Sequence, residues 1–412
     1  MMDRISPLLV ALFFLQITAT AFASNSKTPE SQVHASDEKA RLDEARKLLA
    51  SGLVSEAVSQ LRRLAQRCPA SAEVHLVLGT ALALVPQRSE ALAEIRKAVE
   101  IDPASPAAYH TLGTVLGRFA EPEAARHAFE KAIALDPNFF DARVNLALVL
   151  AQRQEFVDAQ RELRRAIEIV GNRPAAAYPN YLLGKIHNEL EQPAEAVKDF
   201  RRAIRLRPNY AEAHLALGLA QRKLLDAPAA LQALERAVEL SPKNAAAQYR
   251  LGAEYLQTGN PARAAEQLRE AARSMPEDRP VLYNLARALR SSGQVDESAQ
   301  IEQKLRQLME VEERARTSAL EATRLNNQGV ELEKSGNLAA ALEKYQAALD
   351  LDPFHTGFRR NLALCLCRAG QWGRGISELR EILRHNPNDE ETTKALYIAL
   401  EQAEKAKTAD SP

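Results

Sequence analysis

The stretch EKAIALDPNF, residues 130–139, decides the fold because close copies of it recur along the chain. The copies are RKAVEIDPAS (96–105), RRAIRLRPNY (201–210), ERAVELSPKN (235–244) and QAALDLDPFH (346–355). Each reads as the end of a helix followed by a proline, which cannot continue a helix. Pro69, Pro103 and Pro137 follow one another at intervals of 34 residues. A fixed period in this range indicates stacked supersecondary units.

Small residues recur at fixed places inside the period. A glycine precedes the proline by 24 residues, alanines precede it by 12 and 5, and a larger apolar residue precedes it by 8. The glycines are Gly79, Gly113, Gly184, Gly218, Gly252 and Gly329. These spacings predict two helices per unit that approach closely at the small residues, with the larger residue filling the gap. One helix pair cannot bury both of its faces, so the pairs must stack.

This pattern resembles the tetratricopeptide repeat family. The resemblance implies an all-α protein, a right-handed α-solenoid of about ten helix-turn-helix repeats with a C-terminal capping helix. Repeats one to eight (38–312) are assigned to 38–71, 72–105, 106–139, 140–173, 177–210, 211–244, 245–278 and 279–312, and repeats nine and ten (322–389) to 322–355 and 356–389. The fourth repeat has Gly171 in place of the proline, and the tenth has Gly375 in place of an alanine. The eighth has Ser298, Glu302, Leu305 and Glu310 at the four signature places of its second helix, which puts that helix in doubt.

Two segments lie outside the repeats. Residues 390–412 predict a capping helix and tail, with Asn388 or Asp389 as the helix cap and one apolar stripe formed by Ala395, Leu396, Ala399, Leu400 and Ala403. Between Gly293 and Gly329 there is neither glycine nor proline, which favours one long helix with a helical spacer at 313–321. The alternative is an overlong second helix followed by a loop.

The N-terminus has the features of an export signal. One basic residue, Arg4, precedes an apolar run that ends in Ala21-Phe22-Ala23, a small-x-small pattern. We therefore interpret residues 1–23 as a signal peptide and 24–37 as a polar tether, which predicts an exported protein, periplasmic or secreted. The alternative is an uncleaved membrane anchor; after cleavage no stable membrane span is expected.

Charge and motifs argue against several classes of function. Lys+Arg and Asp+Glu both total 54, so the neutral chain has no general affinity for nucleic acid. No phosphate loop, dinucleotide fingerprint or nucleophile elbow is present, and the repeats leave no room for a catalytic domain. We predict no enzyme, no cofactor and no metal site.

His75 and His214 share a repeat position, which indicates helix packing. Cys68, Cys365 and Cys367 are expected to be buried or half-buried thiols, with an intermolecular disulfide as the alternative.

The resemblance implies a concave groove lined by repeat positions 5, 6, 9 and 12, which holds a peptide or a partner helix. In the early repeats these positions are apolar, as at Leu76, Val77, Val144 and Leu148. Asparagines at position 6 form a partial ladder that resembles the arrays of O-linked N-acetylglucosamine transferases. The candidate peptide-binding residues are Tyr181, Lys185, Arg222, Tyr249, Arg250, Tyr283, Asn284, Arg287, Asn327 and Asn361.

Tyrosine and arginine favour a partner protein with an acidic and aromatic segment, extended or helical. The alternative is that these side chains are solvated residues on the helix faces and bind no partner. The predicted function is a non-enzymatic scaffold or adaptor outside the cytoplasm. The alternative is a structural assembly component of an envelope export or secretion machine.

Overall fold

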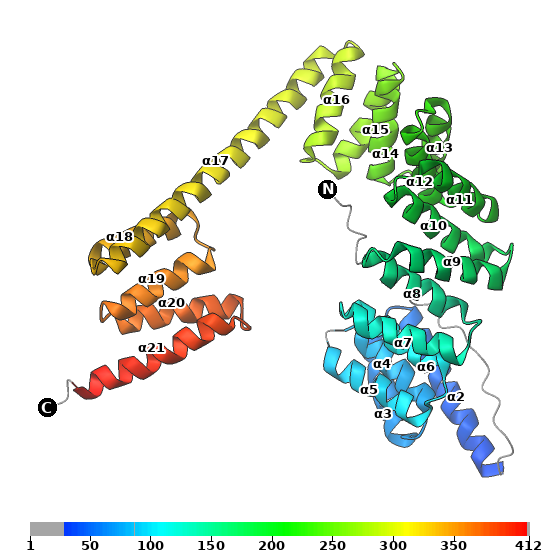
Figure 1. The fold of residues 1–412 in the computed structure, drawn as a ribbon, viewed down its shortest axis with the longest axis horizontal. Coiled ribbons are helices and arrows are strands. Elements are labelled where there is room, and N and C mark those ends of the chain that lie inside the picture. The colour runs from blue at the N-terminus through cyan, green and yellow to red at the C-terminus, as the bar shows by residue number, and fades with distance from the viewer. Residues whose placement is uncertain (1–28, 86, 410–412) are drawn as a thin grey trace. The chain divides into compact units, whose positions relative to one another are not determined.

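The computed structural model describes residues 29–85 and 87–409 (Figure 1). Within these ranges every regular element is helical: twenty α-helices and one short 3-10 helix. The all-α prediction is confirmed. The chain divides into two compact units, residues 1–271 and 272–412. The predicted signal peptide lies outside the described residues, and residues 29–37, expected as part of the tether, belong to the first described helix, α2.

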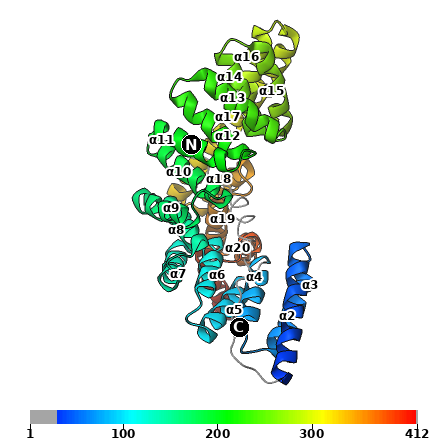
Figure 2. The same ribbon diagram turned by 90° about the vertical axis from the view of Figure 1, so that its right-hand side faces the viewer.

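The first unit is a series of helix pairs, in which the second helix of one pair contacts the first helix of the next. Both views show α2 and α3 lying side by side (Figure 2). Its helices are α2 (Pro29–Ala50), α3 (Val54–Arg67), α4 (Ala72–Ala83), α5 (Arg88–Ile101), α6 (Pro106–Arg118), α7 (Pro122–Leu135), α8 (Phe140–Gln152), α9 (Phe156–Val170), α10 (Ala177–Glu189), α11 (Pro193–Leu206), α12 (Ala211–Lys223), α13 (Ala227–Leu240), α14 (Ala245–Gln257) and α15 (Pro261–Ser274), which crosses the unit boundary. The 3-10 helix η1 (Pro174–Ala176) precedes α10.

The recurring glycines allow the two helices of a pair to approach each other. A Cβ atom added to Gly113 would lie 2.7 Å from Cε1 of Phe129, and one added to Gly184 would lie 2.6 Å from Cε1 of Phe200. Both rings are almost fully buried. The ring of the second helix therefore occupies the space that a side chain on the first helix would need, because interiors are close-packed.

In nine of the ten repeats, the turn inside the pair contains one residue in the left-handed conformation. In the third repeat this residue is Ala120 (φ 58°), and in the sixth it is Leu225 (φ 62°), whereas the first and seventh use Gly52 and Gly259. Non-glycine residues are strained at such angles. Leu225 is also 90% exposed, so its side chain contributes no packing that would offset the strain.

Polar side chains at position 4 connect successive repeats. Each lies within hydrogen-bond distance of the carbonyl oxygen of the proline that ends the preceding repeat, at 2.6–3.2 Å. The pairs are His75–Pro69, Arg143–Pro137, His214–Pro208 and Gln248–Pro242. A helix end leaves carbonyl groups without an intrahelical partner, and these side chains supply a partner. His75 and His214 thus have the packing role expected from their shared position.

The second unit contains the longest helix. Its elements are α16 (Arg279–Ser291), α17 (Val295–Lys334), α18 (Leu338–Leu351), α19 (Thr356–Arg368), α20 (Trp372–His385) and α21 (Glu390–Ala409). α17 contains 40 residues and is continuous through 313–321. It joins the second helix of repeat eight to the first helix of repeat nine (Figure 1), so the expected long helix is present and the loop alternative is wrong.

The eighth repeat forms its second helix although three of its four signature residues are polar. Ser298 is only 1% exposed, and its hydroxyl donates a hydrogen bond to the carbonyl oxygen of Ala286, at 2.9 Å. Glu302 pairs with Arg290 of the facing helix. The doubt about this helix was therefore unfounded: a small hydroxyl fits where alanine is usual, because its polar group is bonded.

The tenth repeat contains two neighbouring cysteines, and its helix packing explains why both are buried. A Cβ atom added to Gly375 would lie 2.6 Å from the carbonyl oxygen of Ala363, so the glycine leaves room for α19. Cys367 is buried at this contact, whereas Cys365 is buried in the cluster that contains Tyr345 and Leu349. Burial raises the pKa of Cys365 to about 11. Cys68 is half-buried. The expectation of buried or half-buried thiols is confirmed.

The last helix, α21, packs against α20 and α19. Its first turn is capped by Asp389, whose side chain accepts a hydrogen bond from the backbone N–H of Thr392 at 2.9 Å. Ala399 is buried in the contact, with Ala395 and Leu396 beside it. Leu400 is 41% exposed, so the expectation that it shares the buried stripe is wrong.

Candidate functional site

Three aromatic rings cluster around the first candidate residue, Tyr181 on α10. Its ring centroid lies 5.2 Å from that of Tyr210, 5.9 Å from Phe200 and 6.4 Å from Tyr178. Burial raises the pKa of Tyr181 to about 12. Its phenol is therefore neutral at physiological pH, and the ring is largely packed between repeats.

Lys185 extends this cluster by one helical turn. Its ammonium nitrogen lies 6.0 Å from the centroid of the Tyr181 ring, within the range of a cation–π contact. Both side chains are half-buried. Tyr181 thus reaches the surface as part of an aromatic and cationic pair.

Arg222 lies near the end of the next first helix, α12, beside two buried acceptors. Gln221 is 4% exposed and Glu254, on α14, is 2% exposed. One side-chain oxygen of each has no hydrogen-bond partner among the described residues. Burial raises the pKa of the Glu254 carboxyl, and the positive charge of Arg222 opposes this effect. A buried unpaired acceptor costs about 1–3 kcal/mol, so this junction favours an incoming hydrogen-bond donor.

Tyr249 and Arg250 are adjacent on α14. The guanidinium carbon of Arg250 lies 5.3 Å from the centroid of the Tyr249 ring, and both side chains are half-buried. Five candidates therefore lie on the first helices of three successive repeats. We call this set the α10–α14 face: Tyr181, Lys185, Arg222, Tyr249 and Arg250.

The other five candidates belong to the second unit. Tyr283 on α16 is 63% exposed, Arg287 is exposed and Asn284 is half-buried. Asn327 on α17 is exposed. Asn361 on α19 donates a hydrogen bond to the side chain of Asn326, at 2.9 Å. Tyr181, Tyr249 and Tyr283 share repeat position 5, which predicts a row along the inner face; the three residues belong to both units, and the row stays a prediction.

The early repeats offer less apolar surface than their sequence suggests. Val77 and Val144 are 3% and 5% exposed, so they belong to the core, and Leu76 and Leu148 are half-buried.

A polar contact lies between repeats three and four. The amide nitrogen of Asn145 lies 2.9 Å from Nε2 of His110. Burial lowers the pKa of His110 to about 4, so its ring is neutral at physiological pH and can accept this hydrogen bond.

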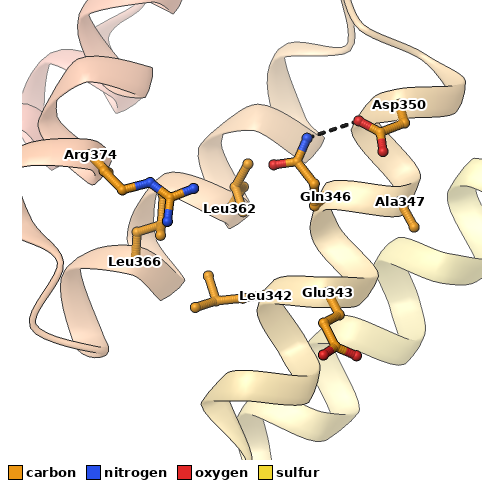
Figure 3. Close-up of a pocket in the computed structure, with 8 residues that line it drawn as sticks. All are labelled: Leu342, Glu343, Gln346, Ala347, Asp350, Leu362, Leu366 and Arg374. Carbon is orange, nitrogen blue, oxygen red and sulfur yellow. Dashed lines mark hydrogen bonds between the residues drawn. The ribbon is translucent and has the colours of Figure 1, made fainter.

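A pocket of about 380 Å³ opens between α18, α19 and α20 (Figure 3). Leu342, Leu362 and Leu366 form its apolar part. The remaining lining residues are Glu343, Gln346, Ala347, Asp350 and Arg374. The first unit has a pocket at the same repeat positions, of about 300 Å³, between α7, α8 and α9. The sequence analysis considered only the inner groove and therefore missed both.

Several other residues of the site were also missed. Tyr178 and Tyr210 fall at repeat positions 2 and 34, outside the four positions taken as groove-lining. Glu254 falls at position 10, where most repeats have an apolar residue or alanine. A polar residue at a usually apolar position was a signal that could have revealed it.

The described residues contain neither a metal-binding cluster nor a membrane-spanning helix. No group of three or more His, Cys, Asp or Glu side chains in residues 29–85 and 87–409 could hold a metal ion. No helix in these ranges is both long and apolar enough to cross a membrane.

Comparison with solved structures finds other repeat proteins. YrrB, a "TPR protein with an unusual peptide-binding site", is 25% identical over 46% of this chain and 96% of its own, with a TM-score of 0.39. PilF of Pseudomonas aeruginosa is 22% identical over 54% and 99%, with a TM-score of 0.48. PilW, a type IV pilus biogenesis factor, is 19% identical over 52% and 97%, with a TM-score of 0.46. No curated protein matches the sequence.

Family models match most of the chain. A model described as TPR repeat matches residues 184–224. Models described as tetratricopeptide repeat match residues 42–106, 120–185, 249–309 and 332–397. Together these ranges cover most of the repeats, and the chain belongs to the tetratricopeptide repeat family.

Proposed function

We propose that the protein is a non-enzymatic scaffold outside the cytoplasm that binds a segment of another protein on the α10–α14 face. The observation that carries the proposal is the arrangement around Arg222. There, a guanidinium lies near the buried Glu254 carboxyl, and Glu254 and Gln221 each have a side-chain oxygen with no partner among the described residues. The first helices of the preceding and following repeats carry tyrosine–cation pairs. The export signal predicted at 1–23 supports the location.

The chemistry of this face favours an acidic segment that also carries an aromatic residue. Arg222 and Arg250 can each hold a carboxylate through two parallel hydrogen bonds. Tyr249 offers apolar area together with a hydroxyl group. The unpaired oxygens of Gln221 and Glu254 fit donors, such as the backbone N–H groups of an extended segment.

A peptide array screened against the purified protein tests the proposal. Acidic peptides with an aromatic residue should bind best, and binding should weaken as salt increases. The double substitution Tyr249→Ala with Arg250→Ala should reduce affinity at least about tenfold, since both residues belong to the hot-spot types.

The matched control is Arg236→Ala on α13, a second helix, because it removes the same charge from an exposed site. It should leave affinity unchanged. Binding that favours basic or purely apolar peptides, or that survives the double substitution, would show that the α10–α14 face is not the binding site.

A further inference from the structure

The last helix exposes apolar side chains that nothing in the described chain covers. Tyr397 is 71% exposed and Leu400 is 41% exposed, although the opposite side of α21 packs against the array through the buried Ala399. The helix therefore has one face in the core and one apolar strip in solvent. An exposed apolar strip with polar neighbours marks an interaction surface.

The repeat register shows what would ordinarily cover this strip. α21 takes the place of a first helix in an eleventh repeat, and Tyr397 and Leu400 fall at positions 8 and 11, which normally face the second helix. In all ten repeats position 8 is glycine or alanine: Ala45, Gly79, Gly113, Ala147, Gly184, Gly218, Gly252, Ala286, Gly329 and Ala363.

Tyrosine at position 8 excludes the ordinary second helix. Even a Cβ atom added to Gly329 would lie 2.7 Å from the Tyr345 ring, and a whole phenol group requires far more space. Tyr397 therefore ends the array and leaves the strip open. Whatever covers the strip must pack in a different geometry from the repeats.

The charges beside the strip are self-complementary. Lys394 and Glu404 lie at its two ends, and neither forms an ion pair or side-chain hydrogen bond with any described residue. Consider two α21 helices that pair antiparallel about a two-fold axis between Tyr397 and Leu400. Tyr397 of each copy then faces Leu400 of the other, and Lys394 of each copy lies beside Glu404 of the other.

We propose that two copies of the protein associate through antiparallel α21 helices. The contact is isologous, because the same strip serves both copies. A single helix pair buries less than the roughly 1,600 Å² of a standard interface, so the association is reversible, with a Kd on the order of micromolar. The proposal does not depend on the α10–α14 face.

Sedimentation equilibrium of the purified protein over a concentration series tests this pairing. The wild-type protein should pass from monomer to dimer, and Leu400→Glu should remain monomeric. Lys394→Glu should weaken the dimer by about tenfold, because it places like charges together. The double variant Lys394→Glu with Glu404→Lys should restore the wild-type affinity, which only contact between two copies can explain.

Ile398→Glu is the matched control. Ile398 is 56% exposed on the same helix but points about 100° away from Tyr397 around the helix axis. This variant should dimerise like the wild-type protein. A wild-type protein that stays monomeric throughout, or a dimer that survives Leu400→Glu, overturns the proposal. If the charge exchange fails to restore a dimer that Lys394→Glu has weakened, the antiparallel register is overturned.

Discussion

The junction between repeats three and four, in the first unit, and the junction between repeats nine and ten, in the second, use the same repeat positions with different residues. Within repeat three Gly113 faces Phe129, and within repeat nine Gly329 faces Tyr345. At positions 5 and 6, His110 contacts Asn145 in one, and Asn326 contacts Asn361 in the other. Both regions thus have a glycine against a buried ring and a hydrogen bond between positions 5 and 6, but only the first has an ionisable side chain, His110, in that hydrogen bond.

The outer surfaces of the two junctions differ in how their charges are used. In the first unit, ion pairs such as Arg126–Glu130 and Arg161–Asp158 border the pocket. In the second unit, Arg374 bonds to the neutral side chain of Gln371, and Asp350 bonds to Gln346 (Figure 3). The same backbone geometry can therefore place ion-paired side chains around the pocket, as in the first unit, or charged side chains bonded to neutral ones, as in the second.

The largest expected effect concerns the glycines at the helix contacts. Gly113→Leu and Gly329→Leu should each lower the free energy of unfolding of their own unit by about 3 kcal/mol or more, because a side chain there overlaps a buried ring. Denaturant unfolding measures the effect, with amide exchange as the readout for each unit separately. If one substitution lowered the free energy of unfolding equally in both units, that result would contradict the division into two units.

Glycines elsewhere in the same junctions provide the controls. A Cβ atom at Gly117 would lie 3.9 Å from Cβ of Ala125, and one at Gly373 would have no neighbour within 4 Å. Gly117→Ala and Gly373→Ala should therefore stabilise their helices by about 0.5–1 kcal/mol.

The next effect is a difference between the two junctions in how their stability depends on pH. The folded pKa of His110, about 4, lies below the ordinary value of 6.5, so the unfolded chain binds a proton first as the pH falls. The first unit should lose about 2–3 kcal/mol of stability between pH 6.5 and pH 4, and no more from this residue below that. His110→Asn, which copies the second unit, should remove this pH dependence. A slope that persists in the variant would assign it to other groups.

A smaller effect concerns the arginine at position 4. Arg143 bonds to Glu162 at 2.5 Å with both side chains 12% exposed, whereas Arg359 bonds to Glu378 at 2.6 Å with exposures of 23% and 30%. Arg143→Met should cost about 2 kcal/mol and Arg359→Met about 1 kcal/mol, because a more buried partner loses more when it is left unpaired. Thermal unfolding of the two variants gives the ranking, and a reversed order would refute this explanation.

The smallest effect concerns the polar end of one ring. The hydroxyl of Tyr345 donates a hydrogen bond to Glu333 at 2.7 Å, and Phe129 has no such group. Tyr345→Phe should destabilise the second unit by about 1 kcal/mol. Tyr397→Phe removes a hydroxyl from an exposed ring and should change nothing measurable, so a similar loss in both variants would argue against the hydrogen bond.

The sequence alone determined the repeat architecture. Most repeats carry a glycine or alanine, a larger apolar residue and a terminal proline within one short segment, so the spacing between them is visible without any neighbour. The long helix was also predictable, because continuity depends on local helix propensity and on the absence of glycine and proline between Gly293 and Gly329.

The tertiary structure alone decided which side chains are exposed. Tyr181 matches Tyr283 in repeat position, yet Tyr181 packs against Tyr210, whereas Tyr283 is largely exposed. Asn361 is bonded because repeat nine places Asn326 opposite it. The physical reason is that contacts between repeats join residues about one period apart, and their outcome depends on both residues. The period reveals where a side chain lies in its repeat, but only the neighbouring repeat decides what it touches.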